Sequence, residues 1–264
     1  MAKTGIILLG ADGRMGCTIA NLLKDNADCF LACAVERPER LENLKNLSCP
    51  VTDNLPKAIE LAPEAVIVDF TAPDASLEAA SIAAACHSPI VIGSTGFGAE
   101  QKAQLEKYAL AAPLLWSANM SIGVNALKEL LPLLVKALGP AYDIEMMEIH
   151  HKHKKDAPSG TALMLAEGMA RARGQNLRDV RRDCRSGIIG PRKDGEIGIQ
   201  AIRGGEVVGE HTIWFFGPSE TLEITHRAAS RENFAQGALR AAAWLGKMPA
   251  GRVYDMRDVL GINL

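Results

Sequence analysis

Five short apolar runs alternate with segments of helical periodicity through the first part of the chain. The runs lie at residues 6–9, 31–35, 65–70, 89–92 and 114–117, and the helical patterns at 15–25, 75–86 and 99–111. Strands that alternate with helices in this way form βαβ units, whose parallel strands carry helices on both faces of the sheet. The alternation therefore predicts a Rossmann-like α/β domain built on a doubly wound parallel sheet.

The pattern changes in the second half. An apolar helix is predicted at 119–139, a strand at 144–149 and a helix at 160–173. Residues 174–194 are rich in Arg, Asp and Gly, and we expect a mobile surface excursion there. Three strands separated by glycine-containing turns follow at 196–226, and a helix at 231–245. This order predicts a second, α+β domain on a mostly antiparallel, open-faced sheet, whose uncovered face a homo-oligomer can bury.

Composition and charge exclude several classes of protein. Hydrophobic residues make up 48% of the chain, which supports a sizeable core, and a net charge of −2 lacks the basic excess of nucleic-acid-binding proteins. No apolar run reaches the roughly 18 residues of a membrane span, and the first run is too short for a signal peptide. The six cysteines form no C-x-x-C pair or dense framework, which indicates reduced thiols. We therefore expect a cytoplasmic protein without nucleic-acid or membrane partners.

Three glycines, Gly10, Gly13 and Gly16, follow the first predicted strand and open the first helix. Glycines at such a turn let the backbone approach a pyrophosphate, and the free N–H groups of a helix start point at its negative charge. The spacing is G-x-x-G-x-x-G rather than G-x-G-x-x-G, so a plain glycine turn is the alternative. The position between strand and helix favours a dinucleotide site, whose candidate residues here are Gly10, Ala11, Asp12, Gly13, Arg14 and Met15.

Glu36 and Arg37 bear on the choice of dinucleotide. Glu36 ends the second predicted strand, where an acidic residue hydrogen-bonds the adenosine ribose hydroxyls. Arg37 can hold a ribose 2′-phosphate, so the pair permits both NADH and NADPH, and a surface ion pair is the alternative. Two further loops follow the fourth and fifth strands at the edge where ligands bind in open sheets. They add the cofactor candidates Gly93, Ser94, Thr95, Ser117, Ala118, Asn119 and Met120.

Residues with titratable or hydroxyl side chains are most concentrated in the segment 150–161, which holds three of the six histidines. A zinc site is one interpretation, but no cysteine is near, and adjacent His150 and His151 project to opposite faces of an extended segment. A solvated basic loop is the second. The third, which we favour, is a substrate site with acid catalysis by His150 and Lys154. Histidine titrates near neutral pH, and a lysine beside other cations becomes a better proton donor.

A helix start follows this basic segment. Gly160 and Thr161 can offer backbone N–H groups, with the hydroxyls of Ser159 and Thr161 beside them. Such a helix start beside His and Lys is a receptor for a carboxylate. The expected substrate is therefore a small anion, a dicarboxylate.

Ten motifs together resemble the dihydrodipicolinate reductase family, also called 4-hydroxy-tetrahydrodipicolinate reductases. They lie at residues 10–16, 69–71, 93–97, 119–124, 148–151, 154–161, 203–205, 209–212, 225–228 and 234–238. The resemblance implies NAD(P)H-dependent reduction of 4-hydroxy-tetrahydrodipicolinate to tetrahydrodipicolinate in diaminopimelate and lysine biosynthesis. Two positions depart from the family pattern. Ser94 stands where threonine is common, and Asp12 stands where a small residue is common.

The resemblance also implies roles for individual residues. His150 is expected to exchange a proton with the substrate ring, Lys154 to be a second proton donor, and His151 to bind substrate. Gly160 and Thr161 would hold a substrate carboxylate. Residues 1–121 and 231–264 would form the dinucleotide-binding domain. Residues 122–230 would form the substrate-binding and oligomerisation domain of a homotetramer, and hinge closure would exclude water.

Three rival functions stay open. One is a nicotinamide-dependent dehydrogenase of another small dicarboxylate. The second is a non-catalytic dinucleotide sensor, which would leave the His-Lys segment without a role. The third is zinc-dependent hydrolysis, although we expect no metal.

Overall fold

The computed structural model describes residues 2–262, which form two compact units. One unit runs to Ile122 and continues from Arg231, and the other is Gly123–Ser230. Residues 1, 263 and 264 fall within the predicted dinucleotide-binding domain and lie outside the described residues. None of the described helices is both long and apolar enough to span a membrane.

The described residues of the first unit form a seven-stranded sheet in the order β12-β6-β5-β4-β1-β2-β3, and neighbouring strands pair in parallel. The strand order reverses beside β1, since β2 and β3 lie on one side and the later strands on the other. Ligands of open α/β sheets bind at such a reversal. The predicted Rossmann-like fold is confirmed. The strands are β1 (Thr4–Leu9), β2 (Cys29–Val35), β3 (Val51–Thr52), β4 (Val66–Asp69), β5 (Ile90–Ile92), β6 (Leu114–Trp116) and β12 (Val253–Tyr254).

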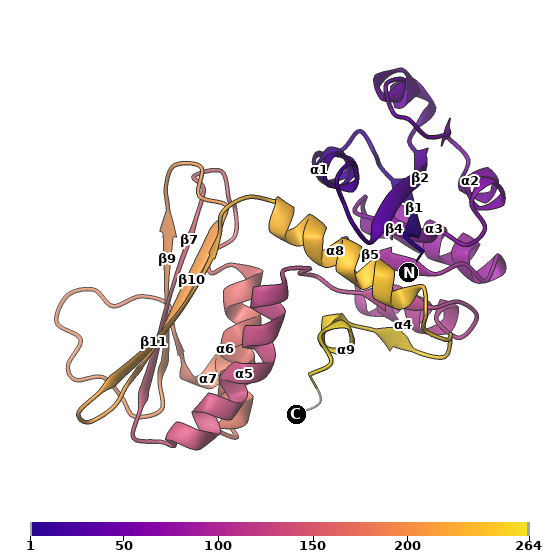
Figure 1. Cartoon of the computed structure of the whole chain (residues 1–264). Helices are drawn as coiled ribbons and strands as arrows, with labels where there is room; N and C mark the ends of the chain where they lie inside the picture. Colours follow the sequence, from indigo (N-terminus) through magenta and orange to yellow (C-terminus); the bar gives the residue numbers. More distant parts are fainter. Residues whose placement is uncertain (1, 263–264) are drawn as a thin grey trace. The chain divides into compact units, whose positions relative to one another are not determined.

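Helices cover both faces of this sheet (Figure 1). Successive side chains of β1 point to opposite faces, so Ile6 and Leu8 join one core and Ile7 the other. Helices α1 and α8 supply the first core, and α2, α3 and α4 supply the second. The bounds are α1 (Arg14–Leu23), α2 (Leu55–Leu61), α3 (Pro73–Ala85), α4 (Ala99–Tyr108) and α8 (Glu232–Leu245).

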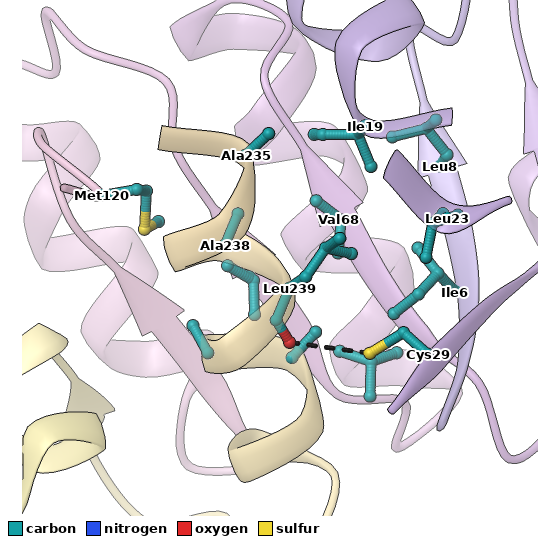
Figure 2. Close-up of a cluster of buried hydrophobic side chains, with 14 of the residues drawn as sticks. Ile6, Leu8, Ile19, Leu23, Cys29, Val68, Met120, Ala235, Ala238 and Leu239 are labelled. Carbon is teal, nitrogen blue, oxygen red and sulfur yellow. Dashed lines mark hydrogen bonds between the residues drawn. The ribbon is translucent and has the colours of Figure 1, made fainter. Parts of the chain in front are cut away.

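Helix α8 packs closely because small residues face the sheet. Figure 2 shows Ala235, Ala238 and Leu239 of this helix beside the strands, where the Cys29 thiol donates to the Leu239 carbonyl at 3.7 Å. A Cβ on Gly237 would lie 1.8 Å from the Met120 carbonyl oxygen. Only glycine therefore fits at that position.

Several short elements have no counterpart in the sequence prediction. They carry too few residues to show a periodic pattern, and α2 is marked only by its Asn54 cap, which accepts a hydrogen bond from the Lys57 N–H. They are the 3-10 helix η1 (Pro38–Leu44), β3, α2, β12 and α9 (Met256–Leu260).

The described residues of the second unit form a five-stranded sheet in the order β11-β10-β7-β9-β8. The pairings of β10 are antiparallel and those of β9 are parallel, so the expected mostly antiparallel sheet is a mixed one. The chain returns from β7 to β9 through a helix, and such a crossover makes the two strands parallel. The bounds are α5 (Ile122–Leu138), β7 (Asp143–His150), α6 (Gly160–Ala172), β8 (Arg181–Arg182), β9 (Ile197–Arg203), β10 (Gly209–Phe216) and β11 (Thr221–Ala228).

Helices α5 and α6 cover one face of the second sheet (Figure 1). Their side chains Leu131, Val135 and Met169 belong to the same core as Ile144 and Phe215. Burial alternates along β7, as expected for a strand with one covered face.

Residues 174–194, predicted as a mobile surface excursion, are mostly exposed and include some regular structure. They contain a short helix, α7 (Leu177–Val180), and the edge strand β8, which pairs with β9. Two arginines connect the segment to β7, since Arg185 donates to both oxygens of Glu145 at 2.8 Å and Arg192 donates to the same carboxylate at 3.0 Å. Arg185 and Arg192 thus form ion pairs on the sheet, while Ile188 and Ile189 of the same segment are exposed.

Candidate functional site

The glycine turn after β1 has the shape of a phosphate cradle. Gly10 has a φ of +65°, a left-handed conformation that favours glycine. A Cβ on Gly16 would lie 2.2 Å from the Gly10 carbonyl oxygen, so the turn closes only with glycine there. Helix α1 begins at Arg14, and its N-cap Gly13 makes no side-chain capping bond. First-turn N–H groups are thus left for a ligand, and the turn fits a pyrophosphate.

Glu36 is tied to this turn. It is buried at the end of β2, where its Oε2 accepts the Asp12 N–H and its Oε1 accepts the Arg37 N–H, both at 3.0 Å. The Asp12 carboxylate turns toward the helix η1, where it accepts hydrogen bonds from Arg40 at 3.3 Å and Asn43 at 3.0 Å. The Asp12 carboxylate is therefore held by two side chains of η1. The residues present fit a dinucleotide.

The other cofactor candidates lie at the same carboxyl edge of the sheet. Gly93 donates its N–H to the Asp69 carbonyl at 2.8 Å, and a Cβ on it would lie 2.2 Å from the Phe70 ring. The Ser94 side chain is buried and accepts the Ser76 hydroxyl at 2.8 Å, so it points into the protein. The Ser117 hydroxyl donates to the Asn119 carbonyl at 2.7 Å. Thr95 and Ala118 are exposed. Met120 is buried in the core that Figure 2 shows.

In the second unit, a buried carboxylate organises the end of β7. Glu148 is 0% exposed and accepts four hydrogen bonds. Arg203 donates two of them at 2.7 Å, His150 Nδ1 lies 2.6 Å away, and the Ser159 N–H donates at 3.0 Å. Burial alone raises the pKa of Glu148, but these bonds outweigh it and hold that pKa below its usual value. Glu148 is therefore an anion that stabilises both cations and the start of α6.

This arrangement orients His150. Because Glu148 is ionised, Nδ1 carries the hydrogen of their bond, and Nε2 is the atom left for proton exchange. Nε2 lies beside Gly209, where a Cβ would approach it to 3.0 Å. Burial lowers the pKa of His150, Glu148 raises it, and Lys154 and Arg203 lower it further, so the net pKa is below the usual value. The free protein therefore favours the neutral imidazole of His150 more than an exposed histidine would.

His211 and Arg203 were not predicted as site residues. The strand register places both residues in the site. His211 of β10 lies opposite Glu148 of β7, and Arg203 of β9 lies opposite His150 of β7. His211 is buried with Nε2 3.1 Å from the Ser159 hydroxyl, and its ring meets that of His150 edge to face at 5.3 Å. Burial first, and then the charge of His150, lower the pKa of His211 to about 4. In the sequence, His211 and Arg203 could have been identified as site residues only because each lies in one of the family motifs.

The remaining substrate candidates surround this core. His151 is half-buried and donates its backbone N–H to the Val207 carbonyl at 2.8 Å, while Lys154 Nζ lies 2.9 Å from Asp156. The hydroxyl of Ser159 caps α6 by accepting the Ala162 N–H at 3.1 Å. Both polar groups of Ser159 are thus engaged within the protein.

The start of α6 differs from Ser159 in its accessibility. Gly160 is exposed and Thr161 is half-buried, at the first turn of a 13-residue helix.

Lys152 and His153 pair with the exposed Glu206. Among residues 2–262 no group of three or more His, Cys, Asp or Glu side chains is arranged to hold a metal ion. The structure thus brings His150, Lys154 and the helix start together in one unit, and the cofactor candidates in the other.

Comparison with known proteins gives a consistent result over both units. The family model described as dihydrodipicolinate reductase, N-terminus, matches residues 4–120, and the C-terminus model matches residues 123–260. A protein of Desulfovibrio desulfuricans named 4-hydroxy-tetrahydrodipicolinate reductase is 54% identical over 257 residues, 97% of this chain and 99% of that protein. The protein of that name from Nitratidesulfovibrio vulgaris is 54% identical over 258 residues, 98% and 100% of the two chains.

A solved structure shows the same fold. It is the dipicolinate-bound dihydrodipicolinate reductase from Paenisporosarcina sp. TG-14, which aligns with a TM-score of 0.78 and 23% sequence identity. The alignment covers 96% of this chain and 98% of that one.

Proposed function

This chain belongs to the dihydrodipicolinate reductase family, and we propose that it reduces 4-hydroxy-tetrahydrodipicolinate to tetrahydrodipicolinate with NADH or NADPH. In the balanced reaction the cofactor supplies a hydride, an acid supplies a proton, and the 4-hydroxyl group leaves as water. This is the reductase step of diaminopimelate and lysine biosynthesis. The observation that carries the proposal is the oriented His150–Glu148 pair, set beside a helix start in a chain so similar to named reductases.

The first unit holds the dinucleotide. The backbone of residues 10–15 and the start of α1 bind the pyrophosphate, because the glycines permit close approach and first-turn N–H groups attract anions. Glu36 accepts hydrogen bonds from ribose hydroxyls. The loops 93–95 and 117–120 hold the remainder of the cofactor at the same sheet edge. When bound, the reduced nicotinamide supplies a hydride.

The second unit binds the dicarboxylate. Gly160 and Thr161 offer N–H groups at the start of α6, where the helix dipole favours a carboxylate. His151 and Lys154 add donors and positive charge from the loop after β7. The structure of the relative from Paenisporosarcina holds dipicolinate, a small dicarboxylate, which supports this class of substrate.

His150 and Lys154 supply the proton. Glu148 stabilises the protonated imidazole through Nδ1, so that Nε2 can give or take a proton at the substrate ring. An anionic substrate raises the pKa of His150, which compensates for the lowering that burial causes in the free protein. Lys154 is a second cation at the same place and can supply a proton in turn.

We also propose that the second unit assembles a homotetramer in the cytoplasm. Ile202 and Phe216, 43% and 42% exposed, lie on the sheet face opposite to α5 and α6. Burying this face against further copies removes apolar surface from water. Sedimentation of the purified protein measures the assembly, and a monomer at micromolar concentration would contradict it.

The test of the reaction is spectrophotometric. Purified protein should oxidise NADH or NADPH when 4-hydroxy-tetrahydrodipicolinate is added, and not when other small dicarboxylates are added. Turnover of another dicarboxylate alone would identify a different dehydrogenase, and cofactor binding without any turnover would identify a sensor. Loss of activity with a chelator would favour the zinc hypothesis.

The His150→Gln variant tests the assigned role. It should lower kcat by about 100-fold or more, since general acid catalysis contributes that much, and leave the Kd for cofactor unchanged. If the variant instead lost cofactor binding, the assignment of His150 to the substrate would be wrong.

A further inference from the structure

The rim of the dinucleotide cradle carries an unusual group of charges. Three carboxylates, those of Asp12, Glu36 and Glu39, lie among two guanidinium groups, those of Arg37 and Arg40. Asp12 lies within the glycine turn, between Gly10 and Gly13. Its carboxylate adds a negative charge to the turn itself.

Both arginines are already paired. Arg37 Nε lies 3.6 Å from Glu39 and 3.9 Å from Glu36. Arg40 Nη1 lies 3.3 Å from Asp12 Oδ2, and Asn43 donates to that same oxygen at 3.0 Å. The Asp12 side chain is only 20% exposed, so two donors hold it in one place. Neither guanidinium is left without a carboxylate.

This rim is next to the expected adenosine ribose. The Asp12 N–H donates to Glu36 Oε2 at 3.0 Å, so the backbone of Asp12 contacts the very carboxylate that recognises the ribose hydroxyls. A 2′-phosphate at the ribose would bring nearly two negative charges beside Glu36 and Asp12. Its compensation would have to come from an arginine, as in NADPH-binding members of this fold.

We propose that the Asp12 side chain makes this site select NADH over NADPH. It does so by holding Arg40 in an ion pair and by adding a negative charge at the position of the 2′-phosphate. This inference rests on the dinucleotide binding in the proposed function and adds the choice of cofactor. NADH does not need a contact with Arg40 to bind, since its ribose hydroxyls need only the acceptor oxygens of Glu36.

The test measures the Kd of the full chain for NADH and for NADPH separately, by titration of cofactor fluorescence without substrate. The wild type should bind NADH more tightly. Asp12→Asn keeps the size of the side chain and removes its charge, so the ratio of the Kd for NADPH to the Kd for NADH should fall by about three- to ten-fold. Glu42→Gln is the matched control, because Glu42 of η1 pairs with Lys45, which follows that helix.

A double variant identifies the phosphate receptor. Adding Arg40→Gln to Asp12→Asn should remove the gain for NADPH, because the freed guanidinium is what binds the phosphate. Two results would overturn the inference. One is an unchanged NADPH/NADH ratio in Asp12→Asn, and the other is a gain that persists in the double variant.

The same titrations separate this inference from the proposed function. Selective NADH binding without substrate-dependent turnover would refute the function and leave the inference standing. Turnover with equal affinity for the two cofactors would refute the inference alone. Binding of neither cofactor would contradict both.

Discussion

Gly209→Ala is the substitution that most sharply tests the account of His150. The three heavy atoms nearest to an added Cβ all belong to the His150 ring, with Nε2 at 3.0 Å, Cδ2 at 3.4 Å and Cε1 at 3.7 Å. Favourable contacts of this kind lie at about 3.5–4.0 Å, so the ring must shift by roughly 0.5–1 Å or leave Nε2 covered. The new methyl group therefore presses most closely on Nε2, the proposed proton-exchange atom.

The ring cannot shift freely. Its Nδ1 is held 2.6 Å from Glu148, which is fixed in turn by Arg203 and the Ser159 N–H. A misplacement of about 1 Å at a catalytic group costs on the order of 100-fold in rate. We expect kcat to fall by about 10- to 100-fold, which corresponds to roughly 1.4–2.7 kcal/mol. The free energy of unfolding should change by less than about 1 kcal/mol, since Gly209 does not have a positive φ.

The assay compares kcat, KM, the Kd for NADH and the urea midpoint of wild type and variant. Gly204→Ala is the matched control, because a Cβ there meets nothing within 4 Å although its N–H donates to the His150 carbonyl at 3.0 Å. The control should behave as wild type. A folded Gly209→Ala protein with undiminished kcat would refute the assignment of proton exchange to Nε2.

Three further outcomes follow from the same contacts. Because the folded pKa of His211 is about 4 and the unfolded value is near 6.5, stability is full above pH 6.5 and is lost as pH falls. Urea unfolding should show a loss of about 2 kcal/mol from pH 7 to pH 5, smaller in His211→Gln, and equal stability at both pH values would contradict this. Glu148→Gln leaves Arg203 without its counter-ion and should destabilise the protein by about 3 kcal/mol in urea titrations, with NADH affinity retained. Gly16→Ala drives a methyl group to 2.2 Å from a carbonyl oxygen and should weaken NADH binding at least about 10-fold, and unchanged fluorescence titrations would refute the cradle.

The sequence predicted the first sheet well because its signals are local. The buried runs of β1 and β4 are mostly continuous and apolar. The glycines of the turn after β1 indicate that two backbone segments approach each other closely there. Elements as short as β3 and α2 carry no such pattern. In the segment 174–194 the ion pairs of Arg185 and Arg192 with Glu145 were not predicted, because composition does not distinguish a paired arginine from a solvated one.

The candidate site was predictable only in part. His150 and Lys154 stand close together in the chain, and their chemistry is visible in the residues themselves. The supporting groups Glu148, Arg203 and His211 come from three strands, and their contacts depend on register. A shift of one residue would turn each of them to the other face of the sheet, and the sequence does not specify such a register.

The most direct test of the central claim follows the hydride itself. Reduction of 4-hydroxy-tetrahydrodipicolinate should be run with NADH that carries deuterium at both positions of nicotinamide C4, and the product analysed by mass spectrometry. The account predicts a product that has gained one deuterium, and labelled product that forms at least about 100-fold more slowly with His150→Gln. A product without deuterium, or cofactor that is never oxidised in the presence of this substrate, would contradict it.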